Sequence, residues 1–243
     1  MNLEGNAAKC RQTMVFAKYD CAELNALMHR QCSNRAGCVR IRPSKYTGTI
    51  GQVVPQIKQL FRRFSCDSPA TMHDARFEFF KEYVLPGLLK SARSASTAHE
   101  TGSGTLLFVP SYLDFVRLRD LFRQHDASVA ACSEYVRTPD LSRFRTQFYG
   151  GRIRLMLYTE RLHFYHRLRI RGARHMIFYG LPQNANFYPE LLNIVEVGGG
   201  GSAAAGTATA LFSKYDALEL ERVVGTRRAK NMLKGSKRNH LFC

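Results

Sequence analysis

Residues 105–125, "TLLFVPSYLDFVRLRDLFRQH", have the pattern of a buried strand that leads directly into an amphipathic helix. Residues 105–109 form a short, continuous apolar run, which is typical of a strand covered on both faces. Ser111 and Asp114 follow at the spacing of a helix capping box. The apolar residues after them recur at the spacing of one helical face: Phe115, Leu118 and Phe122. This stretch therefore predicts a strand, a capped turn and a helix.

The same order is expected in residues 128–151, "SVAACSEYVRTPDLSRFRTQFYGG". An apolar run is followed by Thr138, which is placed to cap a helix, and by Pro139 at the first helical position. Gly150 and Gly151 are typical of a helix end. A second strand and helix are therefore predicted here.

Residues 207–233, "TATALFSKYDALELERVVGTRRAKNML", show this order a third time, with Ser213 and Asp216 at capping spacing. Two short apolar runs, at 153–158 and 175–180, predict further strands. Because continuous apolar strands alternate with helices, the sequence predicts an α/β fold. We expect a parallel sheet with helices on both faces, in a RecA-like or Rossmann-like arrangement.

The rest of the chain is less regular. Residues 12–17 predict a strand, and residues 73–90 predict a helix that Pro86 ends or kinks. The segments 91–104 and 198–210 are rich in small and polar residues, so we expect loops there.

Composition favours a polyanionic partner. The 243 residues carry 36 Lys and Arg against 19 Asp and Glu, for a net charge of +17. An excess of this size suits nucleic acid or an acidic protein surface. No apolar run approaches the roughly 18 residues of a membrane span, so we expect no membrane partner. The seven cysteines include no CxxC pair, which favours reduced thiols in a nuclear or cytosolic protein.

The residue patterns of an enzyme site are not found in this chain. There is no G-x-x-x-x-G-K-[ST] phosphate loop, and the glycine run 198–201 lacks a following lysine. His163 and His166 have the i, i+3 spacing of metal ligands, but no third ligand lies nearby in sequence. We therefore expect no catalytic residues, no metal, no cofactor and no small-molecule substrate.

One cluster of side chains stands out between residues 137 and 174. It contains ten arginines and only two acids, with His163, Phe164, Tyr165 and His166 among them. Arginine side chains suit phosphate oxygens, and aromatic rings suit unpaired bases, so this cluster favours RNA binding. The alternative is that Phe164 and Tyr165 pack in the core while the arginines only solvate the surface.

Several motifs resemble the second RecA-like lobe of superfamily-two RNA helicases. The run "TLLFVPS" resembles motif IV, and "RFRTQFYGGRIRLMLYTE" resembles the segment leading into motif V. The run "HMIFYGLP" resembles the strand that follows, and "RQTMVFA" resembles the motif III strand at the end of the first lobe. The resemblance implies that residues 1–47 are a remnant of the first lobe, its last strand and helix, and that residues 48–243 are the second lobe.

A longer and more specific resemblance is to the digestive organ expansion factor family. It is carried by "FVPSYLDFVRLRDLF", "YTERLHFYHRLRIRG", "FYGLPQNANFYPELLN" and "SKYDALELERVVGTRRAKNMLK", and it extends from Arg11 to the C-terminus. It implies a helicase-like assembly factor of ribosome biogenesis, located in the nucleus and nucleolus. The implied partners are pre-rRNA or snoRNA and other proteins of the small-subunit processome.

The chain departs from active helicases at three motifs. Ala17, Lys18 and Tyr19 stand where motif III has S-A-T, and the motif V region lacks its aspartate. Residues 187–195, "FYPELLNIV", occupy the motif VI position without any arginine. Loss of an arginine finger alone lowers the rate by a factor of about 10³ to 10⁵. The resemblance therefore implies a pseudoenzyme. The alternatives are a fragment of an ATP-dependent RNA helicase whose ATP-binding lobe is missing from this chain, and a module that binds only proteins.

The resemblance also indicates where RNA would bind. In helicases of this architecture, the ends of the motif IV and motif V strands face the RNA backbone. The residues that match these positions, together with the basic segment after them, are our candidate RNA-binding residues: Ser111, Thr159, Arg161, Arg167, Arg169 and Arg171.

Overall fold

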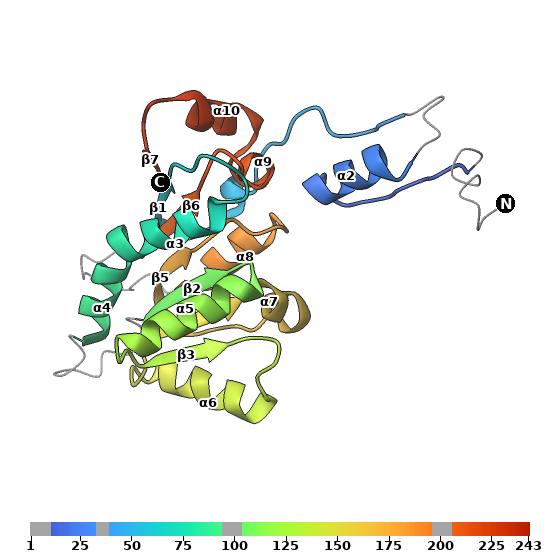
Figure 1. The fold of residues 1–243 in the computed structure, drawn as a ribbon. Helices are drawn as coiled ribbons and strands as arrows, with labels where there is room; N and C mark the ends of the chain where they lie inside the picture. The colour runs from blue at the N-terminus through green and yellow to red at the C-terminus, as the bar shows by residue number, and fades with distance from the viewer. Residues whose placement is uncertain (1–10, 33–38, 94–103, 196–205) are drawn as a thin grey trace. The chain divides into compact units, whose positions relative to one another are not determined.

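The chain divides into two compact units. The computed structural model describes residues 11–32, 39–93, 104–195 and 206–243 (Figure 1). Unit 1 comprises Met1–Tyr46 and unit 2 comprises Thr47–Cys243. This division lies beside the boundary expected at residue 47, while the assignment of the units to two helicase lobes stays a prediction.

Unit 1 is built around helix α2 (Ala22–Arg30), none of whose residues is buried. Asp20 organises its surroundings, because it accepts a hydrogen bond from Asn25 and forms an ion pair with Arg40. The strand predicted at 12–17 is not formed. A strand needs a neighbour to pair its backbone groups, and the described residues of unit 1 supply none.

Unit 2 contains a seven-stranded sheet in the order β3-β4-β2-β5-β6-β1-β7. Its strands are β1 (Lys58–Arg63), β2 (Gly104–Val109), β3 (Val129–Cys132), β4 (Leu155–Thr159), β5 (Ala173–Phe178), β6 (Thr207–Phe212) and β7 (Asn239–Phe242). Neighbouring strands are parallel except for β1 and β7, which are antiparallel. The topology confirms the predicted α/β fold with a mostly parallel sheet. Strand β1 and the short edge strand β7 were not predicted.

Helices cover both faces of this sheet, as predicted. On one face lie α3 (Met72–Tyr83), α4 (Leu85–Arg93) and α5 (Tyr112–Gln124), whose apolar side chains share one buried cluster with alternate residues of β2, β4 and β5 (Figure 1). The 3-10 helix η1 (Ile50–Gln52) precedes β1. The remaining helices each lie between two strands: α6 (Thr138–Tyr149), α7 (Glu160–His166), α8 (Phe187–Leu192), α9 (Ala217–Val224) and α10 (Thr226–Lys234).

The second face has an aromatic core. The Tyr188 ring of α8 stacks on Phe178 of β5 at 4.7 Å between centroids and lies 5.8 Å from the Phe61 ring of β1. Its hydroxyl donates a hydrogen bond to Gln59 Oε1 at 3.0 Å. No helix of the described residues has the length and apolar character that crossing a membrane requires.

Local capping agrees with the sequence in one of three places. Ser111 Oγ accepts a hydrogen bond from the Asp114 backbone N–H and caps α5, as predicted. Thr138 is not a cap, because α6 already begins there and Arg137 is its N-cap residue. At the start of α9 the roles are reversed: Asp216 is the N-cap residue, and its carboxylate accepts from the backbone N–H and hydroxyl of Ser213.

The two expected loops are shorter than predicted. Helix α4 continues through residues 91–93, and β2 begins at Gly104, so only 94–103 remain of the first loop. Strand β6 includes 207–210 of the second loop, because its pairing with β1 and β5 requires these residues. The remainders, 94–103 and 198–205, lie outside the described residues. The helix expected at 73–90 is divided near Pro86, since α3 ends at Tyr83 and α4 begins at Leu85.

Candidate nucleic-acid interface

The carboxyl ends of the parallel strands meet at one edge of the sheet. Val109 at the end of β2 pairs with Thr159 at the end of β4, so Ser111 and Thr159 lie at the same edge. In open α/β sheets this edge is where ligands bind, because the loops that follow the strands meet there.

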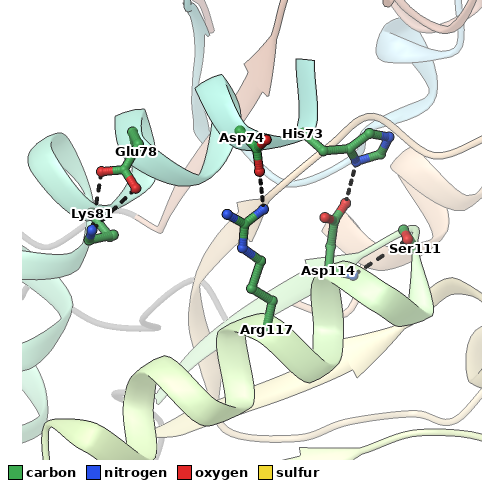
Figure 2. A network of polar contacts seen from close by, with 7 residues as sticks. All are labelled: His73, Asp74, Glu78, Lys81, Ser111, Asp114 and Arg117. Atoms are coloured by element: carbon green, nitrogen blue, oxygen red, sulfur yellow. Dashed lines mark hydrogen bonds and ion pairs between the residues drawn. The ribbon is translucent and has the colours of Figure 1, made fainter. Parts of the chain in front are cut away.

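Ser111 has a structural role at this edge of the sheet. Its side chain caps α5, and the first turns of α5 are joined to α3 by one hydrogen bond and one ion pair (Figure 2). Asp114 Oδ2 lies 3.1 Å from His73 Nδ1, and Arg117 Nη1 lies 2.6 Å from Asp74 Oδ1. The structure therefore places Ser111 at the predicted edge, with its hydroxyl oxygen in use as a helix cap.

Thr159 is buried, and its hydroxyl group already forms two hydrogen bonds within the protein. Its residue is only 2% exposed, its hydroxyl donates to Glu134 Oε2 at 2.9 Å, and its oxygen accepts from the Leu162 backbone N–H at 3.3 Å. Thr159 thus caps α7 and joins it to the segment after β3. An RNA contact through its hydroxyl would require the bond to Glu134 to break.

Arg161 and Arg167 lie at the two ends of α7 with exposed side chains. The Arg161 Nε is 3.6 Å from Glu134 Oε1, and the Arg167 Nε is 3.7 Å from Glu190 Oε2. Arg167 ends the helix in the left-handed conformation, with φ of 39°. Both ion pairs are long and both arginine side chains are more than half exposed, so the guanidinium groups remain accessible to another anion.

Arg169 and Arg171 lie in the segment between α7 and β5. Ile170 between them is buried while both arginines are exposed, so the alternation turns their side chains outward. The backbone carbonyl of Arg169 accepts a hydrogen bond from Arg145 Nη2 at 2.9 Å. The structure therefore brings Arg161, Arg167, Arg169 and Arg171 to one exposed segment, and separates them from the buried Thr159.

The aromatic residues of α7 face outward. Phe164 and Tyr165 are each 61% exposed, and their rings meet edge to face at 5.2 Å. The buried positions of this helix are taken by Glu160, Leu162 and His163 instead. The alternative that Phe164 and Tyr165 pack in the core is therefore wrong.

His163 and His166 do not act as a pair. His163 is buried, with Nδ1 at 3.2 Å from the Tyr158 hydroxyl and Nε2 at 3.2 Å from Glu190 Oε2, whereas His166 is exposed. Burial lowers the pKa of His163, although Glu190 opposes this shift. Among the described residues, no group of three or more His, Cys, Asp and Glu side chains is arranged to hold a metal ion.

Glu160, the first residue of α7, fastens the loop that follows β5. Its carboxylate accepts hydrogen bonds from the backbone N–H groups of Gln183 at 3.2 Å and Asn184 at 3.1 Å. Burial raises the pKa of Glu160 to about 7, while these two bonds oppose the shift. Sequence inspection did not single out this residue.

Helix α8 occupies the position where the resemblance to helicases would place motif VI. Five of its six residues are buried: Phe187, Tyr188, Pro189, Leu191 and Leu192. Its remaining residue, Glu190, reaches His163 and Arg167. The helix therefore presents packing side chains and one carboxylate, and no cationic group.

Helix α3 carries a buried arginine, Arg76. Arg76 of α3 donates to Asp216 Oδ1 at 2.8 Å, and its guanidinium lies between the rings of Phe64 and Tyr179 at 5.5 and 5.8 Å. This ion pair joins residues far apart in the sequence, so local patterns could not reveal it. The available signal was an arginine on the otherwise apolar face of "ARFEFF".

Comparisons with known proteins agree with the resemblance. Residues 49–242 match the family model described as Utp25, C-terminal domain. The U3 small nucleolar RNA-associated protein 25 homolog of Xenopus tropicalis is 39% identical over 241 residues, covering 99% of this chain and 30% of that protein. Protein NUCLEOLAR FACTOR 1 of Arabidopsis thaliana is 36% identical, with the same two coverages. This chain thus spans about a third of the length of these relatives.

Among solved structures, the fold resembles that of S. cerevisiae Dbp5 bound to RNA and ADP BeF3. The matched region covers 82% of this chain and 44% of the Dbp5 chain, with 16% sequence identity and a TM-score of 0.48. The family model covers most of the chain, including every strand of the sheet and the segment around α7. By this match the chain belongs to the Utp25 C-terminal domain family.

Proposed function

We propose that this chain is a non-catalytic, RNA- and protein-binding part of the small-subunit processome, acting in ribosome biogenesis in the nucleolus. Two relatives support the setting by their names, which refer to U3 small nucleolar RNA and to a nucleolar factor. The proposed partners are pre-rRNA or snoRNA and other processome proteins.

The observation that carries the RNA-binding part is the exposed surface of α7. Phe164 and Tyr165 stand in solvent between Arg161 and Arg167, where they add nothing to the core. Exposed aromatic rings beside guanidinium groups suit unpaired RNA, because bases stack on the rings and phosphates pair with the arginines. This surface fits single-stranded RNA with little base selectivity.

The non-catalytic part is supported by α8 and by the sequence. Where the resemblance to helicases would place arginines that stabilise the transferring phosphate, α8 supplies buried apolar side chains. The 243 residues also contain no phosphate-loop motif. Hydrolysis of ATP by residues of this chain would therefore lack the groups that phosphoryl transfer uses. RNA-stimulated ATPase activity that is lost on mutation of a residue in this chain would contradict the proposal and favour a helicase fragment.

Replacement of Phe164 and Tyr165 together by Ala tests the RNA-binding part. We expect single-stranded RNA affinity, measured by fluorescence anisotropy, to fall by about 1–3 kcal/mol for each base that stacks. Tyr149→Ala is the matched control, because Tyr149 is 47% exposed but lies on α6. Circular dichroism should show the same fold for all variants.

A second variant separates phosphate binding from stacking. Changing Arg167, Arg169 and Arg171 to Gln should reduce the dependence of log affinity on log salt by roughly 0.7 for each phosphate that the variant no longer binds. If neither variant changes the affinity or its salt dependence, α7 does not bind RNA, and the protein-only module becomes the better account.

A further inference from the structure

The C-terminal part of the chain carries a second basic surface. Between residues 226 and 238 there are six lysines and arginines: Arg227, Arg228, Lys230, Lys234, Lys237 and Arg238. No Asp or Glu follows Glu221 in the sequence. All six basic residues are exposed, so this segment has an uncompensated positive charge.

Helix α10 arranges three of these residues as a stripe. Arg227, Lys230 and Lys234 are spaced by three and four residues, so they lie on one helical face. Ala229 and Met232 are buried on the opposite face. From the rise of an α-helix, the stripe is about 10 Å long.

The stripe differs from several other exposed arginines of unit 2, which have carboxylate partners. Arg117 faces Asp74, Arg137 faces Asp140, and the two arginines at the ends of α7 face Glu134 and Glu190. In the parts of the chain that the structure describes, no carboxylate lies within ion-pair distance of the three side chains of the stripe. Because no carboxylate has to be displaced, these three cations can neutralise phosphates directly, and the release of cations condensed on the nucleic acid then favours binding.

The helix that carries the stripe is fixed at both ends. At its C-terminus, Arg63 Nη1 of β1 donates to the Met232 and Leu233 carbonyl oxygens at 3.1 and 2.8 Å. At its start, the Thr226 hydroxyl donates to Glu221 Oε1 at 2.6 Å. Arg63 satisfies carbonyl groups that a lysine of the last turn would otherwise reach, so Lys234 is not needed for capping. The stripe is therefore held in place before any ligand arrives.

The chemistry of this surface favours phosphate contacts over base contacts. Phe242 is the one Phe, Tyr or Trp in residues 226–243, and its ring packs edge to face on Phe61 at 5.5 Å. The Arg228 guanidinium lies over the same ring at 5.8 Å. With no ring available for stacking, the surface suits RNA whose bases are already paired, which proteins recognise through its backbone.

We propose that Arg227, Lys230 and Lys234 of α10 bind the phosphate backbone of base-paired RNA, as a second contact separate from α7. The inference rests on the proposed function, since it assumes an RNA partner. Helix α7 follows β4 and α10 precedes β7, and these strands are five spacings apart in the sheet, or about 24 Å. The two surfaces suit a duplex that continues into an unpaired segment.

The test uses the whole chain with Arg227, Lys230 and Lys234 changed to Gln. Binding of a blunt RNA duplex should weaken, with the salt slope reduced by roughly 0.9, the value for B-form duplexes, for each phosphate that is no longer bound. Affinity for a short unpaired RNA should change less than twofold. The matched control changes Arg117, Arg119 and Arg137 to Gln, which removes the same charge from residues that have carboxylate partners.

A loss of duplex binding confined to the stripe variant supports the inference. An equal loss in the control variant overturns it, because only total charge would then matter. Competition by polyglutamate at equal charge as strong as that by duplex also overturns it and assigns the stripe to an acidic protein. If duplex binding survives in the stripe variant but unpaired RNA is lost in the α7 variant, the inference fails while the proposed function stands.

Discussion

Arg76 and Arg117 form ion pairs of similar length in very different surroundings. Arg76 Nη2 lies 2.8 Å from Asp216 Oδ1, and the two side chains are 5% and 12% exposed. Arg117 Nη1 lies 2.6 Å from Asp74 Oδ1, and those side chains are 39% and 71% exposed (Figure 2). Removing one partner of a buried pair leaves an uncompensated charge in the interior, whereas water replaces the partner at the surface.

We therefore expect Arg76→Met to lower the free energy of unfolding by about 3–5 kcal/mol, because the Asp216 carboxylate would remain buried without its cationic partner. Arg117→Gln should lower it by about 0–1 kcal/mol. Urea denaturation of both variants at neutral pH measures the difference. Equal losses in the two variants would show that burial does not decide the strength of these pairs.

Residue roles were predictable where they depend on near neighbours. The cap by Ser111 follows from its spacing to Asp114, and the structure confirms it. The bond between Thr159 and Glu134 depends on the placement of β3 beside β4, which no local pattern contains. For this reason the sequence could place Thr159 at the end of a strand but could not show that its hydroxyl is occupied.

At the scale of elements, the attachment of α7 depends on Glu160. Burial raises the pKa of this carboxyl group from 4.5 to about 7. The folded chain therefore keeps this proton up to about pH 7, whereas the unfolded chain loses it near pH 4.5. Between these values the folded state binds more protons, so the contribution of Glu160 to stability falls as the pH rises.

Glu160→Gln should remove this part of the pH dependence. Between about pH 4.5 and pH 7, the wild-type chain should lose roughly 3 kcal/mol of stability relative to the variant, at 1.4 kcal/mol for each unit of pKa difference. Urea denaturation across this range tests the expectation, with Glu78→Gln as the control because its side chain is exposed beside Lys81. A constant difference between wild type and variant over the range would refute it.

Elements were predictable when their own residues determine them. All six residues of β2 are buried and apolar or small, and its pattern stands out in the sequence. Strand β7 has alternating exposed and half-buried residues and forms because β1 offers an edge to pair with. The run 12–17 is as apolar as a strand, yet it has no such edge and stays irregular. The basic stripe of α10 was readable in "TRRAKNMLKGSKR", but its lack of carboxylate partners required the structure.

At the scale of the whole molecule, the two units should differ in stability. Unit 2 has an extensive core, whereas unit 1 leaves Met14, Phe16 and Ile41 exposed and buries no residue of α2. Burial of apolar surface is the main source of folding free energy, so unit 1 contributes little. Removal of residues 1–46 should therefore change the Tm of the remaining chain by less than about 2 °C.

Differential scanning calorimetry of the full and shortened chains makes this comparison. Limited proteolysis provides a control, since cleavage within unit 1 should precede any cleavage within β2 or β4. A decrease in Tm of about 5 °C or more on truncation would show that unit 1 stabilises unit 2.

The position of β1 in the sheet has a consequence for how the chain is completed during translation. Its two neighbours are β6, where Lys58 pairs with Thr207, and β7, where Gln59 pairs with Phe242. Strands β2 to β5 pair only among themselves and with β6, so they can assemble once residue 178 has left the ribosome. Strand β1 is synthesised before β2 to β5, but it has no partner until β6 and β7 have been synthesised. Contacts of such long range form slowly, and the open edge of β1 is where a nascent or refolding chain is most exposed to pairing with another molecule.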